Sequence, residues 1–156
     1  MNLGYTLSTV VLMYLTFNLS TSLLSTAFGS LSDRIGRKNL LIAGYGLYAV
    51  VYISFGFISQ KVGFLLWVFW PLYGIYFALT EGIEKAFVSD IAPEDSKATA
   101  LGFYHTIVGV GLLPASIIAG ILFSLLPSAP FIFGGALALF TVAILGFFVK
   151  EKDRKD

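Results

Sequence analysis

Four side chains that can carry a charge lie within otherwise apolar stretches of this sequence. Glu81, Glu84 and Lys85 interrupt one such stretch, and His105 is the single histidine of the chain. Glu81 precedes Lys85 by four residues, so on a helix the carboxylate and the ammonium can neutralise each other. We expect a proton-sensitive cluster, with Glu81 as the carboxylate, Lys85 as its counter-charge and His105 as relay. In the alternative interpretation, Glu84 and Lys85 are solvated near an interface and His105 is a packing residue.

A second group of polar and small residues allows two interpretations. Asn18 belongs to a hydroxyl-rich segment, where it either faces a cavity or helps to hold helices together. Gly109, Gly111 and Pro114 mark a segment that can bend and are candidates for a hinge. Close helix packing explains the two glycines equally well.

Aromatic residues form two further patterns. Tyr45, Tyr48 and Tyr52 make a stripe at helical spacing, which we interpret as packing or lipid contact rather than as a cage for a substrate. Trp67 and Trp70 lie near one end of the next apolar segment, as residues of an interfacial aromatic belt do.

The elements that position all these residues are long apolar runs. Hydrophobic residues make up 57% of the 156 residues, whereas charged residues make up 12%, about half the roughly 25% of a soluble domain. Charges are absent from residues 1–32, 39–60, 62–80 and 98–149. Runs of 18 or more apolar residues are typical of bilayer-spanning helices. The pattern predicts an all-α membrane protein and argues against a free-standing soluble domain.

Turn and charge signals divide the chain into five expected transmembrane helices and a charged tail. The helices are placed at about residues 6–30, 39–59, 64–89, 98–123 and 129–149, and the tail at 150–156. Segments of this length cross a hydrocarbon core of roughly 30 Å. With this topology, nine of the ten Lys and Arg residues lie on one side, and only Lys61 lies on the other. The positive-inside rule then predicts a cytoplasmic tail and an N-terminus outside the cell membrane.

The most specific local pattern joins the first two expected helices. It reads Gly29-Ser30-Leu31-Ser32-Asp33-Arg34-Ile35-Gly36-Arg37-Lys38. Gly29 would let two helix ends approach closely, and Gly36 would permit the chain to reverse direction. Asp33 and Arg37 are four residues apart and can form an ion pair if the turn is helical.

This run resembles the signature loop of the major facilitator superfamily, G-x-L-S/A-D-R-x-G-R-K/R. A second stretch, from Glu81 to Pro93 and on through His105 to Gly120, is similar to the fourth helix, acidic loop and fifth helix of the C-terminal half in bacterial members. The resemblance implies that the five helices correspond to helices eight to twelve of twelve. The N-terminal half is the alternative assignment.

The resemblance also implies a function and partners. It predicts part of a secondary active transporter that moves a small solute across the cell membrane by alternating access, with proton coupling as one option. The partners would then be the lipid bilayer, the solute and the missing N-terminal half. Arg37 would close a cytoplasmic latch with Glu84 or Asp90 and so favour the outward-open state.

Other function classes find little support in the sequence. A net charge of +1 gives no basis for a nucleic-acid surface, and one histidine without any cysteine predicts no metal site. No cofactor is expected. An enzyme is not expected either, because no nucleophile–base pair or paired catalytic carboxylates stand out. The alternative to a transporter is a non-transporting membrane interaction protein or an inactive transporter remnant.

Overall fold

The computed structural model describes residues 6–58 and 60–149, so the expected tail at 150–156 lies outside the described residues. Within them the chain forms five long helices and two short 3-10 helices. These are α1 (Leu7–Ile35), α2 (Arg37–Gly56), η1 (Gln60–Leu65), α3 (Leu66–Ile91), η2 (Glu94–Ser96), α4 (Lys97–Leu125) and α5 (Ala129–Phe148). All five long helices are long and apolar enough to cross a membrane. The expected all-α membrane fold is confirmed.

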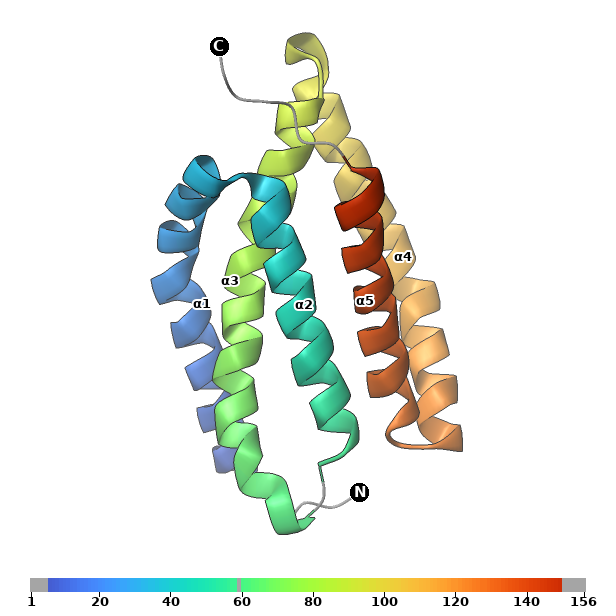
Figure 1. Cartoon of the computed structure of the whole chain (residues 1–156). Helices are drawn as coiled ribbons and strands as arrows, with labels where there is room; N and C mark the ends of the chain where they lie inside the picture. The colour runs from blue at the N-terminus through green and yellow to red at the C-terminus, as the bar shows by residue number, and fades with distance from the viewer. Residues whose placement is uncertain (1–5, 59, 150–156) are drawn as a thin grey trace.

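The long helices stand side by side in the spatial order α1, α3, α2, α5, α4 (Figure 1). Both α1 and α2 pack extensively on α3, and α2 also packs on α5. One end of the bundle carries the α1–α2 turn and η2, and we call it the basic end because Arg34, Arg37, Lys38 and Lys97 lie there. The opposite end carries η1 and the turn between α4 and α5.

The connection between α1 and α2 is shorter than the sequence suggested. We expected a loop from about residue 30, but α1 continues to Ile35 and α2 begins at Arg37. Only Gly36 separates the two helices, with a φ of 93° that favours glycine. Its N–H donates to the Ser32 carbonyl at 3.1 Å. The polar residues of the signature run are therefore helical, and Gly36 alone turns the chain.

The close approach of α1 to α3 depends on one glycine. A Cβ added at Gly74 would lie 2.5 Å from the Phe17 carbonyl oxygen and 2.8 Å from Ser20 Cβ. The Thr21 hydroxyl lies within hydrogen-bonding distance of both carbonyls, at 3.0 Å from Phe17 O and 3.1 Å from Gly74 O. Small residues and hydroxyl groups are the usual means of joining helices in lipid, where burial of apolar surface gives little driving force.

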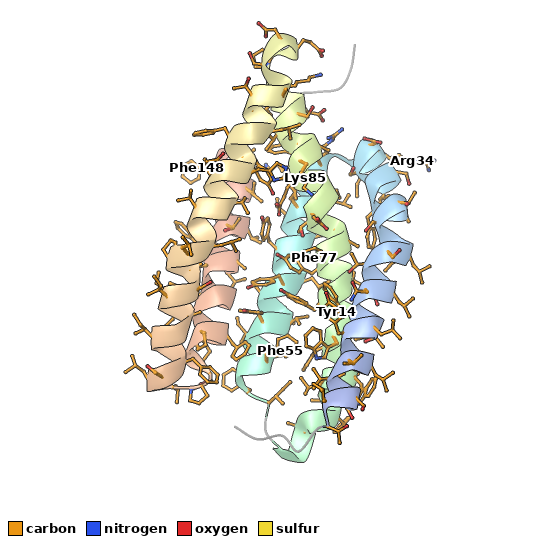
Figure 2. All side chains as sticks on the ribbon, turned by 180° about the vertical axis from the view of Figure 1, so that it is seen from behind. Tyr14, Arg34, Phe55, Phe77, Lys85 and Phe148 are labelled. Atoms are coloured by element: carbon orange, nitrogen blue, oxygen red, sulfur yellow. The ribbon has the colours of Figure 1, made fainter. Side chains whose placement is uncertain are left out.

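Helix α4 is bound much less tightly than the others. None of its residues is buried, whereas α2 and α3 share a core cluster of Leu40, Leu41, Leu79 and Ile83. Viewed from behind, side chains project outward along α4 and α1 (Figure 2). In the described residues, α4 packs only on η2, α3 and α5.

Candidate functional site

At the basic end, Arg37 draws α1, α2 and α3 together. Its Nε lies 2.8 Å from Asp90 Oδ2 at the end of α3, and its Nη2 lies 3.6 Å from Asp33 Oδ1 in α1. The Arg37 side chain is only 12% exposed, although those of Asp90 and Asp33 are 40% and 59% exposed. Gly36 makes this arrangement possible because it sets Arg37 at the first position of α2.

The neighbouring lysine extends this arrangement to a fourth helix. Lys38 Nζ donates to the Gly146 carbonyl at 3.1 Å, close to the end of α5. A cation is favourable there because the last carbonyls of a helix carry partial negative charge. Arg34 is exposed in the last turn of α1. Helix α2 thus carries, in two consecutive residues, the polar contacts to α1, α3 and α5.

Of the two acids expected as the partner of Arg37, Asp90 makes the contact, whereas the Glu84 carboxylate accepts hydrogen bonds from two tyrosines. One expectation about the signature run is not met. Gly29 does not mark a close approach in the described structure, since a Cβ added there would meet nothing within 4 Å.

The Glu84 carboxylate joins three helices. Tyr45 Oη of α2 donates to Glu84 Oε1 at 2.7 Å, and Tyr104 Oη of α4 donates to Glu84 Oε2. All three side chains are half-buried. The two hydrogen bonds thus link α2, α3 and α4 through one acidic side chain.

The expected proton cluster is only partly assembled. Lys85 Nζ lies 3.2 Å from Glu81 Oε1, and both side chains are close to half exposed. His105 is exposed on α4, and its recorded contact among the described residues is the edge of the neighbouring Tyr104 ring. In that part of the chain, His105 therefore makes no hydrogen bond or ion pair with the Glu81–Lys85 pair. Lys85 lies toward the basic end (Figure 2).

The expected cavity and hinge residues lie on open surfaces. Asn18 is exposed and donates to the Tyr14 carbonyl of its own helix at 2.8 Å. Gly109, Gly111 and Pro114 are exposed within α4, which continues as one helix from Lys97 to Leu125. A Cβ added at either glycine would meet nothing within 4 Å, so close packing does not account for them in the described structure.

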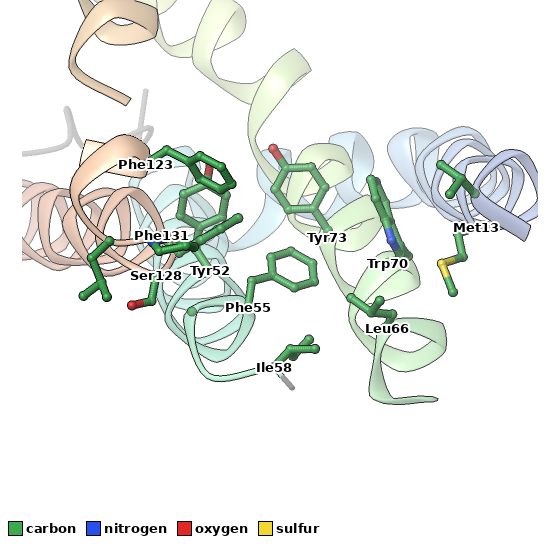
Figure 3. Close-up of a pocket in the computed structure, with 14 residues that line it drawn as sticks. Met13, Tyr52, Phe55, Ile58, Leu66, Trp70, Tyr73, Phe123, Ser128 and Phe131 are labelled. Carbon is green, nitrogen blue, oxygen red and sulfur yellow. The ribbon is translucent and has the colours of Figure 1, made fainter. Parts of the chain in front are cut away.

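An aromatic cavity of about 760 Å³ opens near the opposite end of the bundle (Figure 3). Every long helix contributes to its wall, and none of its described lining residues is charged. Tyr52, Phe55, Trp70, Tyr73 and Phe131 form much of the wall. Their rings also contact one another, with Tyr52 and Phe131 centroids 5.4 Å apart. The volume falls within the range of small-molecule sites.

The matches with known proteins cover nearly the whole chain. The sequence profile of the Major Facilitator Superfamily matches residues 2–156. The chain belongs to the major facilitator superfamily. It is 45% identical over 138 residues to an uncharacterised MFS-type transporter of Methanocaldococcus jannaschii, a match that covers 88% of the chain and 34% of that relative. A second MFS-type transporter of the same organism is 27% identical over 143 residues, which are 91% of the chain and 36% of that protein.

A bacterial member of the superfamily is also similar. The quinolone resistance protein NorA of Staphylococcus aureus is 26% identical over 142 residues, 88% of the chain and 35% of NorA. The chain therefore spans about a third of the length of these curated relatives. Membership in a transporter superfamily agrees with the expectation of a membrane transport protein.

Sequence reasoning missed the tyrosines that hold Glu84. Tyr45 was assigned to a packing stripe, and Tyr104 was passed over beside His105. A signal for them was present in the sequence. Tyr45 lies on α2 and Tyr104 on α4, the two helices next to α3 in sequence, and both lie at a depth along the bundle similar to that of Glu84. Tyr48 and Tyr52 do pack, with ring centroids 4.5 Å apart, although Tyr52 also lines the cavity.

Proposed function

We propose that the chain is the C-terminal part of a secondary active transporter that moves a small solute across the cytoplasmic membrane by alternating access. Its membership in the major facilitator superfamily supports this function. The observation that carries the proposal is a contrast between the two ends of the bundle. The polar contacts of Arg37 and Lys38 join four helices at one end, and the aromatic cavity opens at the other end.

In this proposal the basic end faces the cytoplasm and the cavity opens toward the outside. The positive-inside rule supports that orientation, since the residues of the signature run and Lys97 share one end. Arg37, Asp33 and Asp90 then act as a latch that keeps the cytoplasmic ends of α1, α2 and α3 together. The arrangement corresponds to an outward-open state, and release of Arg37 would accompany inward opening.

The cavity is our candidate for the outer part of the solute path within this half. Its aromatic faces, and the absence of charge among the lining residues that the structure describes, suit a largely apolar solute. For proton coupling, we propose Glu81 as the proton-carrying group, Lys85 as its counter-charge and the exposed His105 as a relay. Exchange of Glu81 for Gln would then abolish the pH dependence of flux.

Thiol labelling tests the latch without knowledge of the solute. Phe123 lines the cavity, whereas Leu125, two residues further along α4, is 76% exposed and does not line it. Each position is changed to Cys in a chain that has no native cysteine. The chain is placed in vesicles together with the N-terminal part of the Methanocaldococcus relative, and a membrane-impermeant maleimide is added from outside.

We expect Arg37→Gln to slow labelling at position 123 several-fold and to leave position 125 unchanged. Equal rates with and without Arg37 would contradict the latch. Because one relative is named for quinolone resistance, a quinolone is a suitable first solute for flux measurements in the same vesicles.

A second candidate function follows from the exposure of α4, which has no buried residue. An uncovered helix suits a membrane protein that assembles with another chain and does not itself transport. Equal labelling rates with and without Arg37, together with stable association of the two parts, would favour this function over transport.

A further inference from the structure

The weakly packed helix α4 has one notable polar connection to the rest of the bundle. Its hydroxyl groups at Thr106, Ser116 and Ser124 donate to carbonyls of α4 itself. Among the described residues, the Tyr104–Glu84 hydrogen bond is the only side-chain hydrogen bond between α4 and another long helix. No apolar residue of α4 is buried to compensate.

The position of this bond divides α4 into two unequal parts. Tyr104 lies in the second turn after Lys97, so the segment near the basic end is held by Glu84. Further along α4 lie Gly109, Gly111 and Pro114, which are all exposed. A Cβ added at either glycine would meet no atom within 4 Å. In lipid, helices associate through van der Waals packing and interhelical hydrogen bonds and not through a hydrophobic driving force. Because α4 has no buried residue, its packing is weak and the hydrogen bond gains importance.

Tyr45 completes the arrangement from the other side. It bonds the second carboxylate oxygen of Glu84 at 2.7 Å, so the acceptor for Tyr104 is itself held between α2 and α3. Both donors are phenolic hydroxyls, and each oxygen of the carboxylate accepts one of the two bonds. Lys85 points to Glu81 instead, which leaves the Glu84 carboxylate to the tyrosines.

We propose that Glu84 is a positioning residue that pins the basic-end third of α4 to α2 and α3 and leaves the rest of α4 free to tilt. We call the hydrogen bonds of Glu84 to Tyr45 and Tyr104 the pin. In the transport cycle proposed above, α4 would move about the pin, and this role rests on the proposed function. The contacts themselves belong to the described bundle and do not depend on that proposal.

Distance measurements between spin labels test the pin directly. Labels at Val50→Cys in α2 and Ile107→Cys in α4 report the position of α4, because both sites are exposed, at 63% and 56%, and lie outside the Glu84 contact. The absence of native cysteine makes the labelling specific. The full chain is studied in lipid nanodiscs by double electron–electron resonance.

We expect one narrow distance in the wild-type chain and a second, longer distance after Tyr104→Phe. The matched variant Tyr45→Phe also loses one hydroxyl from Glu84 but keeps the bond to α4, so its distribution should stay narrow. Glu84→Ala should reproduce the effect of Tyr104→Phe, and Glu84→Gln, which retains an acceptor oxygen, should restore part of the narrow population.

Two outcomes would overturn the pin: a Tyr104→Phe distribution like that of the wild type, or equal broadening by Tyr45→Phe and Tyr104→Phe, which would indicate general loosening. Helicity measured by circular dichroism checks that each variant folds. Because distances are read without flux, a failure of transport would leave them unchanged, and the two failures are distinguishable.

Discussion

The two acidic partners of Arg37 should contribute very differently to stability. Asp90 approaches Arg37 at 2.8 Å, whereas Asp33 lies 3.6 Å away and is more exposed. An ion pair between partly exposed groups contributes up to about 1 kcal/mol, and the short distance and the burial of the Arg37 side chain place the Asp90 contact at the upper end of this range. The longer, solvated contact of Asp33 should contribute at most about 0.5 kcal/mol.

The variants Asp90→Asn and Asp33→Asn test this difference at nearly constant side-chain volume. We expect Asp90→Asn to lower the free energy of unfolding by about 1 kcal/mol and Asp33→Asn by at most about 0.5 kcal/mol. Unfolding in mixed micelles of dodecyl maltoside and sodium dodecyl sulfate can be followed through the fluorescence of Trp67 and Trp70. An effect of Asp33→Asn as large as that of Asp90→Asn would refute the reasoning from distance and exposure.

Two further predictions concern packing and topology. Gly74→Ala should destabilise the chain by about 1–3 kcal/mol in the same unfolding assay because its Cβ would clash with the backbone of α1, whereas Gly82→Ala, with nothing within 4 Å, should be neutral or slightly stabilising. A larger loss at Gly82 would contradict the helix contact. Arg34→Cys and Lys97→Cys should react with an impermeant thiol reagent only from the cytoplasm, and Lys61→Cys only from outside. Labelling of positions 34 and 97 from opposite sides would disprove the topology.

The ion pair between Arg37 and Asp33 shows what sequence spacing could predict. The four-residue spacing predicted the contact on the condition of a helical turn, but the structure forms it across the Gly36 break, between the end of α1 and the start of α2. The same spacing predicted the Glu81–Lys85 pair, which the structure contains within α3. Both contacts join residues that are four apart in the sequence.

The choice between Glu84 and Asp90 as the partner of Arg37 required more than spacing. Both acids belong to α3 and both were candidates for a contact with Arg37. The height of α2 relative to α3 selects Asp90, because the core of Leu40, Leu41, Leu79 and Ile83 sets their register. Glu84 then lies further from the basic end than Asp90, where its carboxylate contacts Tyr45 and Tyr104.

The sequence by itself determined that this protein is a bundle of membrane-spanning helices with a glycine turn at the signature run. Long uncharged runs and local spacing are enough for that conclusion, since lipid requires each backbone amide to be satisfied within its own helix. The tertiary structure alone decided which helices touch, which acid meets Arg37, and that Glu84 joins Tyr45 to Tyr104. These contacts join residues distant in sequence, and helix packing rather than local periodicity sets their distances.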